Sequence, residues 1–179
     1  MKEIFFHICC APCFLYPFKV LTEKDYIIKG FFYNPNIHPL DEYNRRYDTL
    51  QSYVSDKNIE IIIDNYDIED FFDKYKKDED RCFNCYKLRL EKTAKMARDL
   101  GINTFSTSLL YSKRQKHNMI KEIGFNIAEA YKLNFYYEDF RVGWQWGIEE
   151  SKRIGIYRQK YCGCLFSYKE RFLNNNKVF

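Results

Sequence analysis

His7-Ile8-Cys9-Cys10-Ala11-Pro12-Cys13 stands near the start of the chain, directly after the apolar run Ile4-Phe5-Phe6, which is typical of a short buried strand. The chain has seven cysteines, and they form three clusters: Cys9/Cys10/Cys13, Cys82/Cys85 and Cys162/Cys164. Cysteines that only pack a core would be scattered singly along apolar faces. The clustering therefore predicts that thiolates from three distant segments meet at one inorganic site. Buried structural thiols are the alternative.

Strand and helix patterns alternate along the sequence. Strands are expected at 4–8, 26–33, 59–63, 102–108 and 133–137, and helices at about 14–24, 40–57, 67–75, 82–100 and 120–131. A charged loop is expected at 76–81, and loop with a short helix from residue 139 onward. This order predicts an α/β, Rossmann-like fold, in which helices cover both faces of a mostly parallel sheet. The C-terminal loop and helix region would complete a metal site, and residues 1–179 would form a single domain.

Polar groups follow several of these strands. The Cys9 cluster follows the first strand, Asn34 follows the second, and Thr107-Ser108 end the fourth. In open parallel sheets, ligands bind beyond the carboxyl ends of the strands. We therefore expect the site at this edge, although no G-x-G-x-x-G dinucleotide motif follows any strand.

Composition limits the environment and the partners. The 179 residues include 29 Lys and Arg against 25 Asp and Glu, so a polyanionic partner is permitted but not required. No apolar run reaches the ~18 residues of a membrane span, and no signal peptide is visible. We expect a cytoplasmic protein that does not associate with membranes. Clustered cysteines in a reducing compartment favour metal or redox chemistry over structural disulfides.

The cysteine spacing leaves three chemistries open. Cys10/Cys13 and Cys82/Cys85 would suffice for structural zinc, any four of the thiolates for an iron–sulfur cluster, and Cys82/Cys85 for a thioredoxin-like dithiol. A disulfide between Cys162 and Cys164 would close a small, strained ring that is easily reduced. This pair is therefore interpreted as a two-electron store. The alternative is that both thiols bind metal.

Several motifs in one order carry a resemblance to a known family. They are Cys9-Cys10-Ala11-Pro12-Cys13; Asn34-Pro35-Asn36-Ile37-His38-Pro39 with Glu42-Tyr43 and Arg46; Arg81-Cys82-Phe83-Asn84-Cys85-Tyr86 with Arg89-Leu90-Glu91; Ser106-Thr107-Ser108-Leu109-Leu110; Asp139-Phe140-Arg141; and Tyr157-Arg158-Gln159-Lys160-Tyr161-Cys162-Gly163-Cys164. Over nearly its whole length the chain resembles the QueH-type, cobalamin-independent epoxyqueuosine reductases.

The resemblance implies an activity and a set of site residues. The reaction would reduce epoxyqueuosine to queuosine at the tRNA wobble position, with a [4Fe–4S] cluster as cofactor. Its ligands would be Cys9, Cys10, Cys82 and Cys85, and Cys162 and Cys164 would be the redox-active pair. Cys13 would serve a second, mononuclear iron, or replace Cys9 or Cys10 as a cluster ligand. The partners would be tRNA carrying epoxyqueuosine in its anticodon and an electron donor that the sequence does not identify.

The reaction also needs protons and contacts to RNA. Asp139, His38 and Tyr161 are the candidate proton donors, although Asp139 has the alternatives of pairing with Arg141 or capping a helix. Candidate phosphate contacts are Arg45, Arg46, Lys113, Arg114, Lys116, Lys152, Arg153, Arg158 and Lys160, and candidate stacking residues are Tyr111, Trp144 and Trp146.

Two other functions remain as alternatives. The first is a zinc-binding module without catalytic activity that docks on RNA or protein. The second is an ATP-dependent tRNA thiolation enzyme, but cysteines occupy the position where its Ser-Gly-Gly-x-Asp-Ser-type phosphate loop would follow the first strand.

Overall fold

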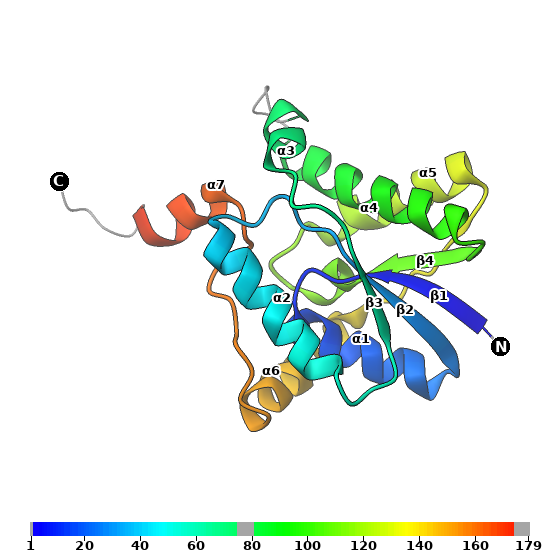
Figure 1. Cartoon of the computed structure of the whole chain (residues 1–179), viewed down its shortest axis with the longest axis horizontal. Helices are drawn as coiled ribbons and strands as arrows, with labels where there is room; N and C mark the ends of the chain where they lie inside the picture. The colour runs from blue at the N-terminus through cyan, green and yellow to red at the C-terminus, as the bar shows by residue number, and fades with distance from the viewer. Residues whose placement is uncertain (1, 75–80, 174–179) are drawn as a thin grey trace.

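A five-stranded parallel sheet forms the centre of the molecule (Figure 1). The computed structural model describes residues 2–74 and 81–173. The strands lie in the order β3-β2-β1-β4-β5, and their bounds are β1 Lys2–His7, β2 Tyr26–Phe32, β3 Glu60–Ile63, β4 Thr104–Thr107 and β5 Asn134–Phe135. All five expected strands are present, and the α/β fold with a parallel sheet is confirmed.

Helices cover both faces of this sheet. The α-helices are α1 Ala11–Glu23, α2 Leu40–Val54, α3 Ile68–Lys74, α4 Arg81–Asp99, α5 His117–Tyr131, α6 Trp144–Arg153 and α7 Leu165–Tyr168. Short 3₁₀ segments occupy Ser108–Tyr111 and Phe140–Gly143, and a π-helical turn occupies Lys169–Leu173. Helices α4 and α5 pack together on one face, whereas α1 packs against β2, α2 and α6 on the other (Figure 1). No helix in residues 2–74 and 81–173 is long and apolar enough to cross a bilayer.

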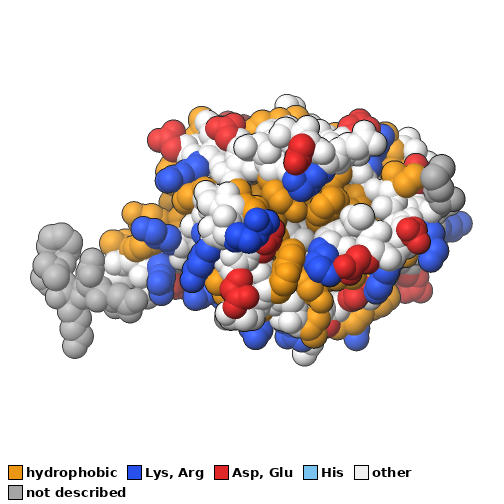
Figure 2. All heavy atoms as spheres, turned by 90° about the horizontal axis from the view of Figure 1, so that it is seen from below, with side chains coloured by type: hydrophobic (Ala, Val, Ile, Leu, Met, Phe, Trp, Pro, Cys, Tyr) orange, Lys and Arg blue, Asp and Glu red, His pale blue; other side chains and the backbone are white. Residues whose placement is uncertain are grey.

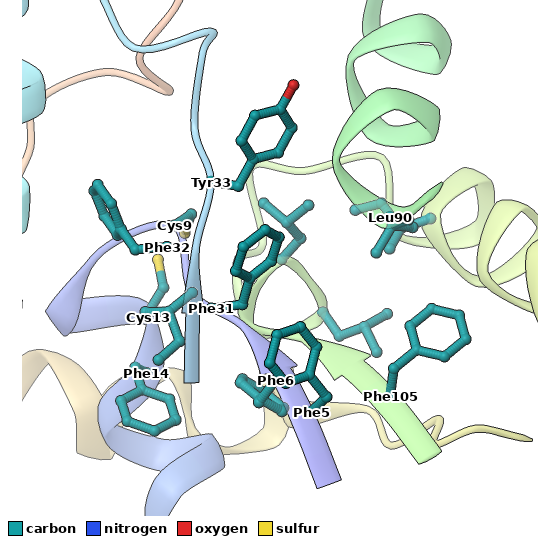
Figure 3. Packing of buried hydrophobic residues seen from close by; sticks show 14 of the residues in the cluster. Phe5, Phe6, Cys9, Cys13, Phe14, Phe31, Phe32, Tyr33, Leu90 and Phe105 are labelled. Carbon is teal, nitrogen blue, oxygen red and sulfur yellow. The ribbon is translucent and has the colours of Figure 1, made fainter. Parts of the chain in front are cut away.

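Aromatic side chains fill the core around the central strands. Phe5, Phe6, Phe31 and Phe105 are fully buried, and the rings of Phe5 and Phe31 lie 5.2 Å apart (Figure 3). Full burial of one such side chain contributes about 1.5–3 kcal/mol. This packing fixes β1 at the middle of the sheet, so the turn after His7 opens at the centre of its carboxyl edge.

Helix α6 was not expected from the sequence. Residues from 139 onward were expected to form loop and a short helix, but Trp144–Arg153 forms ten helical residues that pack against α1. Gly147 lowers the local helix propensity, but a side chain there would meet the Tyr111 hydroxyl oxygen at 2.1 Å. Tertiary packing therefore overrides a weak local signal. The expected loop at 76–81 lies largely outside the described residues, and Arg81 already belongs to α4.

Candidate functional site

The three N-terminal cysteines meet where β1 passes into α1. Cys10 is the residue before the first turn of α1, and Pro12 and Cys13 lie within that turn. The Sγ atoms of Cys9, Cys10 and Cys13 lie within 4.8 Å of one another, and all three residues are buried. Cys9 and Cys10 Sγ are 3.7 Å apart, and Figure 3 shows Cys9 and Cys13 beside each other. This is the one group of metal-ligating side chains that comes together in the described part of the chain.

The surroundings shift the pKa values of the three thiols in different directions. Hydrogen bonds from the Cys10 and Cys13 thiols hold the pKa of Cys9 well below its usual value. Burial raises the pKa of Cys10, and hydrogen bonding to Cys10 and Cys9 raises the pKa of Cys13. The Ser108 hydroxyl also donates to Cys9 Sγ at 3.3 Å. Three cysteine side chains this close together are a donor set that a metal can take over by displacing their protons.

A cavity of about 450 Å³ opens beside these thiols at the carboxyl edge of the sheet. It is lined by Cys9, Pro12, Cys13, Asn34, Asn36, Ile37, Arg46, Arg89, Leu109, Tyr111, Ser112, Arg114, Gln115, Trp144, Gly147, Ile148, Ser151, Arg158, Gln159, Lys160, Tyr161, Cys162 and Arg171. Cys9 and Cys162, which are about 150 positions apart in the sequence, therefore line the same cavity. The cavity and the three thiols lie beyond the carboxyl ends of the strands, where the sequence predicts the site.

Two arginines that line the cavity are almost completely buried. Arg46 on α2 is 2% exposed, and Arg89 on α4 is 1% exposed. Arg46 Nε donates to Glu42 Oε1 at 2.7 Å, and Arg89 donates to Cys85 Sγ at 3.1 Å. A buried charge is costly unless it is paired. These two cations therefore give the cavity a positive wall that favours thiolates.

Arg46 also holds the segment 157–164, which we call the strap. Its guanidinium donates to the carbonyls of Tyr161 and Cys162 at 3.1 and 2.9 Å, and the His38 amide donates to the Gly163 carbonyl at 2.8 Å. Gly163 has φ +134°, and a Cβ there would lie 3.0 Å from Ile37 Cγ1. Three consecutive carbonyls of the strap are thus fixed against α2 and the loop before it.

The two strap cysteines lie in different surroundings. Cys162 lines the cavity and is exposed, and its Sγ accepts a hydrogen bond from Gln115 Nε2 at 3.4 Å. Cys164 is half-buried at the start of α7, where its Sγ accepts a hydrogen bond from the Ser167 amide at 3.4 Å. Surrounding protein raises the pKa of the Cys162 thiol to about 11. All seven cysteines are free, without a disulfide.

Cys82 and Cys85 lie in the first two turns of α4. Cys85 is buried beside Arg89, and Cys82 is half-buried. Neither belongs to the close group formed by Cys9, Cys10 and Cys13. Arg89 lines the same cavity as Cys9 and donates a hydrogen bond to Cys85 Sγ, so it lies between the Cys9 and Cys85 segments.

The three candidate proton donors have different positions. Asp139 does not line the cavity, and its carboxylate pairs with Arg141 at 2.6 Å and caps the 3₁₀ segment, which lowers its pKa to about 2. Both expected alternatives for Asp139 are therefore present. His38 is buried between Phe71 and Phe72, and burial lowers its pKa. Among the three, Tyr161 lines the cavity; its hydroxyl donates to the His38 carbonyl, and burial raises its pKa to about 12.

The basic and aromatic candidates also separate. Arg114, Arg158 and Lys160 line the cavity, as do Tyr111 and Trp144, whose rings lie 5.3 Å apart. Arg46 is wrong as a phosphate contact because its guanidinium is buried and used within the protein. On the face shown in Figure 2, basic and acidic side chains are interspersed.

Sequence reasoning missed the role of two glutamines. Gln159 Nε2 donates to Cys10 Sγ at 2.8 Å and lies 3.5 Å from Cys13 Sγ. Its buried Oε1 has no hydrogen-bond partner among the described residues. Gln115 contacts Cys162 and accepts a hydrogen bond from the Tyr86 hydroxyl at 2.7 Å. In the sequence, the only indication of a role for Gln159 was its position in the motif Tyr157–Cys164, three residues before Cys162.

Comparisons with known proteins agree on one family. The family model described as epoxyqueuosine reductase QueH matches residues 4–170. A curated relative named epoxyqueuosine reductase QueH from Thermotoga maritima is 37% identical over 182 residues, which covers 96% of this chain and 93% of the relative. Relatives of the same name from Dehalococcoides mccartyi and Streptococcus pyogenes are each 33% identical, over 95% and 93% of this chain and 94% and 71% of their own lengths.

Proposed function

The chain belongs to the QueH family of epoxyqueuosine reductases, and from this premise we propose that it reduces the epoxide of epoxyqueuosine at the wobble position of tRNA to give queuosine. It is an oxidoreductase, as its curated relatives are named. The observation that carries the proposal is the buried group of Cys9, Cys10 and Cys13 beside a cavity that Cys162 also lines. Such a donor set suits iron in a reducing enzyme.

The residues present fit an iron–sulfur cofactor. We propose Cys9, Cys10, Cys82 and Cys85 as ligands of a [4Fe–4S] cluster, with Cys13 serving a second iron or replacing Cys9 or Cys10. Buried Arg46 and Arg89 support thiolates in this region, because each brings a positive charge next to sulfur. When bound, the cluster would supply single electrons, and a second iron would supply a Lewis acid.

The chain's own residues supply the remaining functions. Reduction of an epoxide to an alkene and water takes two electrons and two protons, and the Cys162/Cys164 pair stores two electrons as a dithiol. Tyr111 and Trp144 give the cavity an aromatic wall against which a base can stack. Arg114, Arg158 and Lys160 place positive charge on the lining, where RNA phosphates can bind. A proton-donor role for Asp139 stays a prediction. The ion pair with Arg141 opposes it, because it favours the ionised carboxylate over the protonated acid.

The test is an anaerobic purification followed by a visible spectrum and by iron and sulfide analysis. We expect brown protein with about four iron and four sulfide per chain, absorbing near ~400 nm as iron–thiolate clusters do. Zinc without sulfide, in protein never exposed to air, would overturn the cluster and favour the zinc-binding module. Affinity for tRNA should fall as salt rises, because phosphate contacts release counterions.

Single Cys→Ala variants then separate the proposed roles. Variants of Cys9, Cys10, Cys82 or Cys85 should lose iron and sulfide, whereas Cys162 and Cys164 variants should keep both and lose turnover on epoxyqueuosine-containing tRNA. The Cys13 variant is the matched comparison, since it tests whether the third member of the close group holds the cluster. Unchanged turnover in the Cys162 and Cys164 variants would contradict the proposed redox pair.

A further inference from the structure

The strap cysteines are not equivalent, and their difference suggests a direction for thiol exchange. Cys162 lines the cavity and is exposed, whereas Cys164 is half-buried and packs against the core. Thiol exchange requires the attacking sulfur to reach one sulfur of the disulfide while the other departs as a thiolate. Access therefore favours attack at Cys162, and the surroundings of Cys164 determine how well it leaves.

Cys164 lies beside a backbone amide that is suited to a leaving thiolate. The Ser167 amide donates to Cys164 Sγ at 3.4 Å. The Cys164 thiol donates to the Ser167 hydroxyl oxygen at 3.4 Å, and that hydroxyl donates to the Cys164 carbonyl at 2.7 Å. Hydrogen bonds to a charged acceptor are stronger than those to a neutral one. A thiolate formed at Cys164 therefore finds a backbone amide already in place, and the Ser167 hydroxyl donates to it once it turns away from the Cys164 carbonyl.

Backbone hydrogen bonds hold the strap around its two cysteines. Arg46 binds the carbonyls of Tyr161 and Cys162, and the His38 amide binds that of Gly163. The access of Cys162 to the cavity and the contacts of Cys164 with Ser167 are thus features of a held conformation.

We propose that Cys162 is the sulfur an external dithiol attacks, and that Cys164 is the leaving thiolate, which Ser167 stabilises. A donor thiolate bonds to Cys162 Sγ, the bond between the two cysteines breaks, and its electron pair leaves on Cys164. The donor's second thiolate then attacks its own sulfur in the mixed disulfide and releases Cys162. The donor dithiol becomes a disulfide, and the strap pair gains two electrons and takes up two protons. This inference rests on the proposed redox role of the pair.

Mapping of the attacked sulfur tests the proposal directly. The full-length, cluster-containing chain with its strap pair oxidised is exposed anaerobically to reduced glutathione, and the released thiol is trapped with N-ethylmaleimide. Tandem mass spectrometry of the strap peptide then locates both adducts. We expect glutathione on Cys162 and maleimide on Cys164 in at least ~10-fold excess over the reverse arrangement, as access governs which sulfur is attacked. Equal amounts, or an excess of the reverse, would overturn the proposal.

The role of Ser167 has its own measurement. Ser167→Ala removes the hydroxyl and keeps the amide, so reduction of the pair by dithiothreitol should slow by about 3-fold, the effect of one modest hydrogen bond. Ser167→Thr should restore the rate because it keeps the hydroxyl. Ser55→Ala is the matched control, since Ser55 makes a similar hydrogen bond at the end of α2. An unchanged rate in Ser167→Ala would refute the part assigned to Ser167.

The outcomes also separate this inference from the proposed function. A chain whose strap pair never closes a disulfide, but which still reduces epoxyqueuosine, would overturn the inference and leave the function standing. Selective attack at Cys162 in a chain without reductase activity would support the inference while the function failed.

Discussion

Replacing Arg46 with methionine should show how strongly the strap is tied to the body of the protein. Methionine keeps much of the side-chain volume and removes the charge and the donors. The guanidinium loses a 2.7 Å ion pair with Glu42 and two hydrogen bonds to strap carbonyls, at 2.9 and 3.1 Å. Breaking a buried pair by removing one partner costs ~3–5 kcal/mol.

The structure places Arg46→Met at the lower end of that range. Glu42 is only 11% exposed, but its other oxygen keeps a hydrogen bond from the Tyr157 hydroxyl at 2.6 Å. We therefore expect the free energy of unfolding to fall by about 3 kcal/mol. In a double-mutant cycle with Glu42→Gln, the coupling energy between the two positions should be ~1–3 kcal/mol.

Urea denaturation of proteins with equal iron content measures the loss. Lys19→Met is the matched control, because it removes an exposed ion pair with Glu23 on α1 and should change the free energy of unfolding by less than ~0.5 kcal/mol. Hydrogen exchange adds a local readout: in Arg46→Met, exchange should rise more in the strap than in α5. A loss below ~1 kcal/mol, or a uniform rise in exchange, would refute the clamp.

Three further predictions follow from local geometry. Gly163→Ala should lower the free energy of unfolding by ~2–3 kcal/mol, because Gly163 has φ +134° and an added Cβ would contact Ile37. Gly155→Ala is the control: Gly155 has φ +70° and open space around it, so the loss should be only about 1 kcal/mol. Equal losses for the two variants in urea denaturation would contradict this reasoning. Gly147→Ala should displace the Tyr111 ring and cost ~1–3 kcal/mol, which a thermal melt would reveal and an unchanged midpoint would exclude. Asp139→Asn should reduce stability at pH 7 by under ~1 kcal/mol, since the pair with Arg141 is partly solvated. Arg141 depresses the pKa of the folded-state carboxyl to about 2, so this contribution is present above the unfolded pKa near ~3.9 and is lost as pH falls toward 2; a difference that stays constant down to pH 2 would argue against it.

The sheet was predictable from the sequence because its signals are local. Phe5 and Phe31 stand in short apolar runs, and parallel pairing follows from the alternation of strands with helices. The position of the thiols was predictable for the same reason, since Cys9 directly follows β1. Helix α6 was not predictable, because Gly147 lowers the helix propensity of this segment. The reason for a glycine there is its close approach to Tyr111, which only the fold shows.

The charges of the site were harder to predict than its sulfurs. Arg46 stood in a charged stretch that reads as solvated surface, and it was assigned to phosphate, although it is 2% exposed. Its partners, Tyr161 and Cys162, lie more than 110 positions away, so no local pattern reports them. Gln159 reaches Cys10 across an even longer separation. Residue type and spacing identified the thiols, whereas burial and pairing had to come from the fold.

The buried arginines explain how a fold with an aromatic core can hold several thiols at one edge. Thiolates are anions, and burying an anion is unfavourable unless a cation or a metal balances it. Arg46 comes from α2 and Arg89 from α4, so the two helices deliver positive charge from different directions while β1 and the strap deliver sulfur. Each arginine also makes a contact that positions a cysteine segment: Arg46 holds the strap, and Arg89 contacts Cys85. Charge balance and positioning are therefore performed by the same side chains, and a substitution at either arginine should disturb metal binding and folding together.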